Sequence, residues 1–529
     1  MSPLVPPAGA TPAAQRPGRS AAWPALALLL VYAGLVAGSF GPYLSDDHPF
    51  RQAQTAIIAR YFSGGGDWLA YQMPVFGPPW AMPFEFPLYQ ALAKGLQVTS
   101  GLSLETSGRL VAIAFFLLCF WPLHDVLRRW GVRNTPLAMA PVLLAPLYVL
   151  WSRGFMIETT ALFFALAFLA LFLRVLADPR PGPAPLLLLL LAAGVLAALV
   201  KITTLLPAMV VTLAVNAALL VRAWRRRQPL AALLALAAVQ ALVLALAAAW
   251  VVHADGVRLH NPIGPLLTSG ALRDWNFGTF AQRLDPRVWS AIASNSIEIL
   301  FPLSRALAAL KYLQLLGWLA LFAGFFAACM PARRRQVLLL CGLFVLPFAV
   351  FTNLHRVHNY YQAANAVFLC LAFGLAACGA VEAAPDARRA RLRLGLYAVA
   401  LLGFALNSVW YLQFKRSDVG IGLELSALVQ RLSPEGSVIV TTGLDFSAVL
   451  PYQSGRRALM LPERIGSKAV TPEMATASLQ ALRDSGQPAS LYVACDGSAS
   501  ALDPLVREFF ALGSREPDAR ADECSLYRL

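Results

Sequence analysis

The sequence predicts an α-helical polytopic membrane protein that ends in a small α/β domain. Hydrophobic residues make up 58% of the 529 residues, and charged residues make up 13%, which is about half of their usual share in soluble proteins. The mean hydropathy is +0.61. Apolar runs of bilayer length recur as far as residue 412, and the composition turns soluble from residue 418 onward. This pattern excludes a soluble enzyme of ordinary composition.

Eleven apolar runs are expected to cross the membrane, because each offers close to the roughly 17 to 25 residues that a spanning helix needs. They occupy residues 23–42, 108–127, 136–151, 155–176, 185–200, 202–221, 230–252, 308–329, 336–353, 360–381 and 394–412. Residues 23–417 therefore form the predicted transmembrane domain. Residues 1–22 are rich in proline and alanine, and we expect a disordered cytoplasmic tail in front of a retained anchor.

Clusters of arginine predict the orientation, because short cytoplasmic loops are enriched in basic residues. The clusters follow every second span: Arg128, Arg129 and Arg133; Arg174 and Arg180; Arg222 and Arg225 to Arg227; Arg333 to Arg335; Arg388, Arg389, Arg391 and Arg393. The N-terminus is then cytoplasmic, and the C-terminus lies outside with the long loops at 43–107 and 253–307. The net charge of +15 is explained by these connectors, so no nucleic-acid partner is expected.

The first outer loop, at 43–107, is aromatic and is expected to lie on the membrane surface. Its first part predicts an interfacial amphipathic helix at 50–62. At helical spacing one face carries Phe50, Ala53, Ile57 and Tyr61, and the residues turned away are Arg51, Gln52 and Thr55. The second long loop, at 253–307, is long enough to form a lid.

Residues 418–529 are predicted to form a periplasmic α/β domain. Strands are expected at 437–442, 458–461, 491–494 and 525–529, and helices at 423–432 and 473–485. Cys495 and Cys524 lie in this segment, where an oxidising compartment permits a disulfide. The sequence leaves their pairing open.

Two adjacent carboxylates, Asp46 and Asp47, follow the first span directly. At the rim of a bilayer such a pair can supply a general base beside an anionic lipid substrate. The alternative is structural: Ser45 or Asp46 caps the following helix, with Pro49 in its first turn.

The histidines favour a functional outer face, since five of the six map there: His48, His253, His260, His355 and His358. Carboxylate and imidazole groups together can hold a divalent metal. The candidate ligands are Asp47, Glu85 and His260, and the alternative is that these histidines are solvated at the interface. No short ligand spacing supports a metal.

Ionisable residues at the bilayer boundary are costly and usually functional. Here they are Arg109, Arg153, Glu158 and Lys201. Lys201 is either a snorkelling turn residue or a clamp for a phosphate. Glu85 is the only charged residue between positions 73 and 90, so it needs a partner. It either pairs with Arg51 or Arg60 or contacts the substrate.

Taken together, the motifs resemble those of one family. They are Asp46-Asp47 with Arg51, Gly66-Asp67-Trp68, Phe84 to Tyr89, Arg153 to Glu158, Lys201, and His358-Asn359-Tyr360-Tyr361. The set is similar to the polyprenyl-phosphate-sugar-dependent glycosyltransferases of the C-type membrane fold, the group of the protein O-mannosyltransferases and the lipid A aminoarabinose transferases. The resemblance covers most of the transmembrane part.

The resemblance implies an inverting sugar transfer at the outer face, with Asp46 as catalytic base and Asp47 where the family usually has Glu. Glu85 matches the Glu of a Glu-Lys-Pro motif, but Phe86 replaces the Lys that meets the lipid phosphate. Lys201, Arg258 and Arg356 are the candidates for that task. The remaining expected substrate contacts are Arg51, Arg153, Glu158, His358, Tyr360 and Tyr361.

The expected donor is a polyprenyl-phosphate-linked sugar, and the acceptor is an envelope glycan, a lipid or a protein. The expected location is a bacterial inner membrane, with the active site facing the periplasm. The main alternative is a lipid or sugar transporter or flippase, which would show paired repeats or helices broken near mid-bilayer. A scaffold of an envelope-assembly complex would not depend on the acidic residues.

Overall fold

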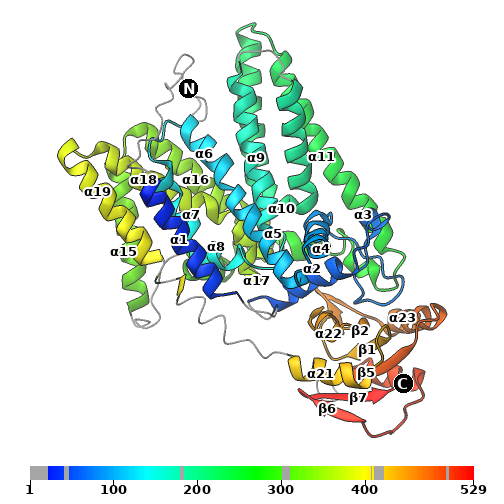
Figure 1. The fold of residues 1–529 in the computed structure, drawn as a ribbon. Coiled ribbons are helices and arrows are strands. Elements are labelled where there is room, and N and C mark those ends of the chain that lie inside the picture. The colour runs from blue at the N-terminus through cyan, green and yellow to red at the C-terminus, as the bar shows by residue number, and fades with distance from the viewer. Residues whose placement is uncertain are drawn as a thin grey trace.

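The protein consists of a helical bundle and an α/β domain docked at one end of it (Figure 1). The computed structural model describes residues 22–40, 44, 47–178, 184–300, 310–404, 406, 408–409, 422–495 and 500–529. Asp46 and nearly all of the predicted tail at 1–22 lie outside the described residues. We call the end of the bundle that carries residues 422–529 the domain end.

Five helical segments among the described residues are long and apolar enough to cross a bilayer. They are α5 with α6 (Leu104–Arg129), α9 (Glu158–Ala177), α10 (Ala184–Arg225), α11 (Ala231–Arg258) and α18 (Ala366–Ala383). Shorter apolar helices are α1 (Ala22–Gly38), α7 (Thr135–Leu144) and α15 (Lys311–Ala328). The chain is therefore a multi-pass membrane protein, as predicted.

The other helices of the bundle and its loops are shorter or more polar. They are α2 (Pro49–Tyr61), α3 (Asp67–Ala70), α4 (Leu88–Ser100), α8 (Pro146–Trp151), η2 (Gly264–Leu267), α12 (Arg273–Phe277), α13 (Phe280–Leu284), α14 (Pro286–Leu300), α16 (Pro331–Val350), α17 (Thr352–Val357), η4 (Asn359–Ala364), α19 (Asp386–Val399) and the π-helix η5 (Ala400–Phe404).

Helix α10 contains the predicted spans 185–200 and 202–221, and it breaks between them at Lys201, whose backbone is extended (φ −166°, ψ 95°). Gly194, before the break, packs against Val243 of α11. Asn216, after the break, hydrogen-bonds Gln240 of α11 at 3.2 Å. In one straight helix these two residues would lie about 33 Å apart, whereas their partners are less than one turn apart. The chain therefore reverses at Lys201, and the two halves form an antiparallel hairpin.

Helix α2 forms at the predicted place, but its polar side is covered by protein. All side chains from Gln52 to Ala59 are buried, because α4, α5 and the C-terminal domain cover the helix. Its polar groups find partners inside: the Gln52 amide accepts from the Phe155 N–H at 3.0 Å and donates to the Asp47 carbonyl at 3.1 Å. The helix starts at Pro49 with His48 as N-cap residue and no side-chain capping bond; Ser45 and Asp46, the caps considered from the sequence, lie outside the described residues.

Residues 422–529 form a five-stranded sheet of order β2-β1-β5-β7-β6. Strands β1 (Val438–Thr442), β2 (Arg457–Leu461) and β5 (Ala489–Ala494) are parallel, and β7 (Cys524–Arg528) and β6 (Ala519–Ala521) are antiparallel. Helices α21 (Leu423–Leu432), α22 (Val449–Ser454), α23 (Pro472–Asp484) and α24 (Asp503–Phe509) accompany the sheet, with a small hairpin of β3 (Arg464–Ile465) and β4 (Lys468–Ala469). The four longest strands lie where the sequence predicts them; β6 was not predicted.

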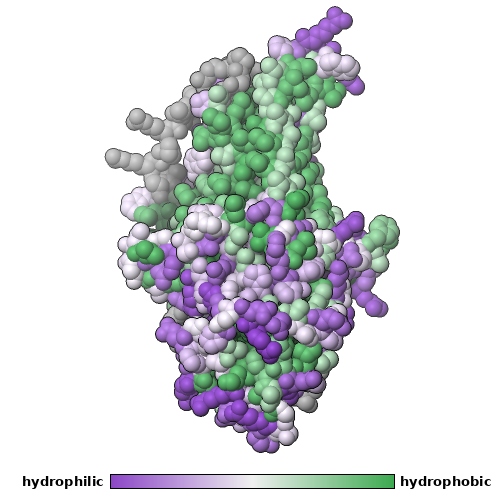
Figure 2. Space-filling view, turned by 90° about the vertical axis from the view of Figure 1, so that its right-hand side faces the viewer, coloured by the Kyte–Doolittle hydropathy of each residue, from purple (hydrophilic) through white to green (hydrophobic). Residues whose placement is uncertain are grey.

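The surface divides by hydropathy in the same way as the chain does. Figure 2 shows a broad hydrophobic surface over the upper helices, with a hydrophilic tip above it and a mixed polar surface over the lower part. The tip corresponds to the turn between α10 and α11, where Arg222 and Arg225 to Arg227 are exposed. A hydrophobic surface between two polar ends is the pattern of a protein embedded in a bilayer.

Cys495 and Cys524 form a disulfide that joins the end of β5 to the start of β7 across 29 residues of sequence. Replacing both by serine should lower the stability of the C-terminal domain by about 3 kcal/mol, because the closed loop restricts the unfolded chain. Thermal unfolding of the purified protein measures the loss, and unreduced peptide mapping checks the bond. The control is Cys341→Ser, which removes a free cysteine; equal melting temperatures for the two variants would contradict a stabilising disulfide.

Candidate active site

The first element of the site is an ion pair between Arg51, in the first turn of α2, and Glu85 of the first long loop. A second guanidinium N–H of Arg51 donates to Gln54 at 2.8 Å. Burial works against the charged carboxylate, but the positive charges of Arg51 and Lys201 outweigh it and lower the pKa of Glu85 below its ordinary value. Glu85 is therefore ionised at neutral pH. Of its two predicted partners, Arg51 is the correct one.

The second element is a buried ion pair between Lys201 at the break of α10 and Glu158 at the start of α9. The side chains are 5% and 3% exposed, so the prediction of a snorkelling turn residue is wrong. The Lys201 ammonium lies 4.4 Å from the ring centre of Tyr361 and 5.3 Å from that of Tyr360. At these distances both rings stabilise the cation.

The two ion pairs belong to one cluster. The positive charge of Lys201 helps to lower the pKa of Glu85, and the negative charge of Glu158 helps to raise the pKa of Arg51. Phe86 explains the proximity: its N–H donates to the carbonyl of Leu199 at 2.9 Å, two residues before Lys201. We call the residues Arg51, Glu85, Glu158, Lys201, Tyr360 and Tyr361 the charged cluster. It lies at the domain end of α9 and α10.

Histidines adjoin the charged cluster through the segment 358–361. The His48 ring is hydrogen-bonded to the Asn359 side chain at 2.8 Å, and its centre lies 5.5 Å from that of His358. The His358 ring stacks on Tyr360 at 5.2 Å. Burial first, and then the charges of His48, Arg51 and Lys201, lower the pKa of His358 to about 4. His358 is therefore a neutral hydrogen-bonding group at neutral pH.

A frame of polar contacts fixes the backbone around Glu85. The Tyr71 hydroxyl is buried, donates to the Glu85 carbonyl at 3.0 Å and accepts from the Phe84 N–H at 2.6 Å. From α11, the Trp250 indole donates to the Phe84 carbonyl at 2.9 Å. Arg258 donates to the Pro83 carbonyl at 3.0 Å and pairs with Asp255. These contacts fix the backbone of the loop next to Glu85, and Arg258 therefore supports the site through the loop backbone.

The predicted site residues are thus only partly brought together. Arg153 is buried, at 1% exposure, in the turn before α9, while Arg356 and His260 are exposed. Asp47 immediately precedes His48, and Asp46 is outside the described residues. In the described part of the chain, no three His, Cys, Asp or Glu side chains are placed together as metal ligands. Asp47, Glu85 and His260 therefore do not form the metal site that was considered.

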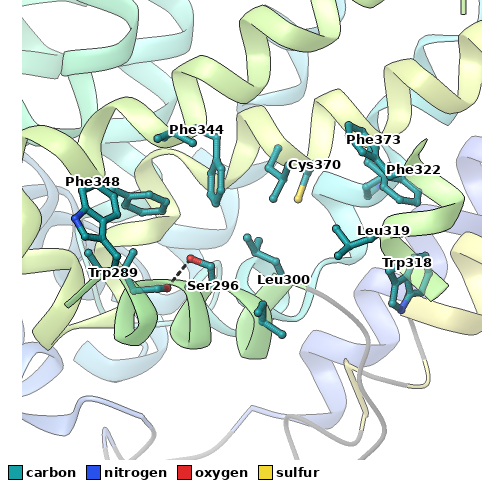
Figure 3. A pocket seen from close by; sticks show the side chains of 16 residues that line it. Trp289, Ser296, Leu300, Trp318, Leu319, Phe322, Phe344, Phe348, Cys370 and Phe373 are labelled. Atoms are coloured by element: carbon teal, nitrogen blue, oxygen red, sulfur yellow. Dashed lines mark hydrogen bonds between the residues drawn. The ribbon is translucent and has the colours of Figure 1, made fainter. Parts of the chain in front are cut away.

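An apolar cavity of about 390 Å³ lies among α14, α15, α16 and α18. Figure 3 shows its labelled walls: Trp289, Ser296 and Leu300 of α14; Trp318, Leu319 and Phe322 of α15; Phe344 and Phe348 of α16; Cys370 and Phe373 of α18. The Ser296 hydroxyl is satisfied by the Ile292 carbonyl at 2.8 Å, so the lining has no free polar group there.

Two ring contacts link the cavity lining to the charged cluster. The Phe348 ring packs on His355 with centres 4.8 Å apart, and His355 faces Tyr361 at 6.2 Å. The cavity therefore lies near the charged cluster, with His355 between the two.

Tyr71 is the functional residue that the sequence analysis missed. Nothing in its neighbourhood distinguishes it, because its role depends on the hairpin that pairs Gln72 with Ala81. His48 and Asn359 were visible as parts of motifs, but their hydrogen bond joins positions 311 residues apart. Pairings of this range leave no local signal.

No protein-family model and no curated protein matches this sequence. Solved structures do match. A crystal structure of ArnT from Cupriavidus metallidurans bound to undecaprenyl phosphate superposes with a TM-score of 0.58 at 17% identity, over 96% of this chain and 98% of ArnT. The chain has the ArnT fold.

A second structure supports the same assignment. The arabinofuranosyltransferase AftD from Mycobacteria matches with a TM-score of 0.50 at 18% identity, over 96% of this chain and 40% of AftD. The resemblance to C-type membrane glycosyltransferases is thus confirmed at the level of the fold.

Breaking the ion pair between Lys201 and Glu158 should be more harmful than removing both charges. Lys201→Met leaves a buried carboxylate alone and should cost about 3 to 5 kcal/mol, whereas Lys201→Met combined with Glu158→Gln should recover most of that loss. Thermal unfolding in detergent measures both, with Lys468→Met as the control at an exposed lysine. Additive losses in the double variant would contradict the pairing.

Acidification should destabilise the wild type through His358. Its pKa is about 4 in the folded protein and about 6.5 in the unfolded chain, so the unfolded chain takes up the proton first. The wild type should therefore lose stability relative to His358→Gln as the pH falls from about 6.5 to about 4, with no such difference above that range. Melting curves against pH test this, with exposed His260→Gln as control; parallel curves for wild type and His358→Gln would refute it.

Proposed function

We propose that this protein is an inverting glycosyltransferase that moves a sugar from a polyprenyl-phosphate donor to an envelope glycan, lipid or protein acceptor. The observation that carries the proposal is the nearly full-length match to the fold of ArnT, which was crystallised with undecaprenyl phosphate. The apolar cavity beside the charged cluster supports it, because a polyprenyl phosphate combines a long apolar tail with an anionic head.

Lys201 takes the task of the family lysine that Phe86 replaces. The Phe86 ring stacks on Trp68 and meets Trp250 edge-on, so it contributes packing and no charge. Its backbone bond to Leu199 brings Lys201 to the same place. Arg258 is engaged with the Pro83 carbonyl and Asp255, and Arg356 is exposed. Lys201, by contrast, lies in the charged cluster, where its charge reaches Glu85. We therefore assign the contact with the donor phosphate to Lys201, which exchanges Glu158 for the phosphate as its partner.

Asp46 is assigned as the base and Asp47 as its support. A carboxylate removes the proton from the acceptor hydroxyl or amine as that atom attacks the anomeric carbon. The bond to the phosphate oxygen breaks on the opposite side, and nearby cations stabilise the departing phosphate. Because phosphate is already a good leaving group, no general acid is needed. Glu85, paired with Arg51, and neutral His358 orient the donor and exclude water.

The proposed arrangement in the cell is a bacterial inner membrane with the domain end in the periplasm. Eleven spans between residues 23 and 417, an inward N-terminus and the outward domain at 418–529 satisfy the arginine distribution. The disulfide between Cys495 and Cys524 supports an oxidising compartment for that domain. The break in α10 is a turn between antiparallel helices, so it does not favour the transporter alternative.

Asp46→Asn should lower transfer at least about 100-fold, the usual contribution of a general base, and Asp47→Asn should lower it less. Purified protein in lipid nanodiscs is supplied with polyprenyl-phosphate sugars, and transfer is measured by mass spectrometry. In parallel, each variant is expressed in a strain that lacks the gene, and the envelope glycans of that strain are analysed. Asp274→Asn is the control at an exposed acidic residue near the same end. Unchanged transfer by both variants at normal protein levels would remove the base assignment.

A further inference from the structure

The edge of the C-terminal sheet is occupied by a segment of the first long loop. Phe76 forms an antiparallel bridge with Leu459 of β2. The Gly77 N–H donates to the Ala458 carbonyl at 3.2 Å, the Ala458 N–H donates to the Pro74 carbonyl at 3.0 Å, and the Met460 N–H donates to the Val75 carbonyl at 2.8 Å. Residues 74–77 thus dock on the edge strand β2: Pro74 and Val75 form a turn, and Phe76 pairs with the strand through a single bridge.

The fit between the loop and β2 is tight at one glycine. A Cβ added to Gly77 would come within 2.9 Å of Leu459 Cδ1, and the backbone of Gly77 has a φ of +73°. Phe76 beside it is 1% exposed, and its ring meets Phe446 of the C-terminal domain. The contact is therefore packed like a protein core.

A second contact fastens α2 to the same domain. Arg60 donates to the Tyr452 carbonyl at 2.5 Å, and its guanidinium lies 3.9 Å from the centre of the Tyr452 ring. The Tyr452 hydroxyl donates to Glu105 at the start of α5 at 2.5 Å. One side chain of the C-terminal domain thus joins two helices of the bundle.

A short path leads from β2 to the ion pair of the site. The docked segment 74–77 lies within the hairpin in which the Met73 N–H donates to the Trp80 carbonyl and the Met82 N–H donates to the Tyr71 carbonyl, both at 3.0 Å. The hairpin places Tyr71, whose hydroxyl holds the backbone of Phe84 and Glu85. A displacement of the strand therefore moves the carboxylate that pairs with Arg51.

We propose that the C-terminal domain is a positioning element of the active site: β2 holds residues 74–77 through the Phe76 bridge and the adjoining backbone hydrogen bonds, and through Tyr71 it sets the place of Glu85. This inference rests on the proposed transferase function for its catalytic effect, while the strand pairing itself is independent of any activity. The domain is then required for turnover even with an acceptor that it does not bind.

The test uses Gly77→Ala, which forces a methyl group against Leu459. The matched control is Gly101→Ala, since Gly101 has the same φ of +73° and nothing within 4 Å of an added Cβ. Both variants carry the backbone strain, but only Gly77→Ala places a methyl group against Leu459, which is fully buried and has little room to turn away. Leu459→Val in the Gly77→Ala background removes the Cδ1 atom and should restore the contact in part.

Two readouts are expected to move together. Hydrogen exchange of the peptides covering 74–77 and 457–461 should speed up in Gly77→Ala and not in Gly101→Ala. The kcat for transfer should fall about 10- to 100-fold, as for a misplaced catalytic group, while the KM for the donor lipid stays within about twofold. Faster exchange with an unchanged kcat would overturn the positioning role. Unchanged exchange would overturn the pairing of residues 74–77 with β2.

Cleavage of the intact chain separates positioning from folding defects. With a protease site inserted between residues 416 and 417, the C-terminal fragment should stay bound after cleavage in a membrane mimic, with kcat within about twofold of the uncut protein. Dissociation of the fragment with transfer retained would overturn the proposal. If the wild type transfers no sugar from any polyprenyl phosphate, the proposed function fails, and the exchange measurement alone still decides the strand pairing.

Discussion

The buried ion pair between Lys201 and Glu158 is the interaction on which the arrangement of the site depends. An isolated charge in the apolar end of a helical bundle costs several kcal/mol, so each of the two residues requires the other. The pair ties the turn of the α10 hairpin to the first turn of α9. Those two helix ends in turn carry the loop that holds Glu85 and the segment that holds Tyr360 and Tyr361.

The rest of the domain end is held by side chains that bond to loop backbone. The Asn261 amide donates to the carbonyls of Phe76, Gly77 and Pro79 at 3.2 to 3.3 Å. Further along the same loop, Trp250 donates to the Phe84 carbonyl and Arg258 donates to the Pro83 carbonyl. Loops that cross a polar face with few apolar contacts would otherwise be mobile. These donors turn the long loop into a rigid wall of the site.

Composition and periodicity predicted the membrane class, the turn at Lys201 and the strands of the C-terminal domain, because each of these depends on short stretches of sequence. The motifs also pointed to Arg51, Glu85, Glu158 and Lys201 as neighbours. The environment of α2 was mispredicted for a different reason: Arg51, Gln52 and Thr55 do mark a polar face, but α4, α5 and the distant C-terminal domain cover the helix. The docking of segment 74–77 on β2 leaves no strand signal in the sequence, because Pro74 and Val75 form a turn and only Phe76 pairs with β2.

The contact between Arg60 and Tyr452 joins residues 392 positions apart, and this sets the order in which the molecule can mature. The first long loop is synthesised before most of the bundle, yet its partner strand β2 is among the last segments to appear. Contacts of such range form late and slowly. Until then, Phe76 and the side of α2 that packs on α22 lack their partners in the C-terminal domain. The bundle can therefore assemble first, and the charged cluster gains its full set of supporting contacts only when the last hundred residues have folded.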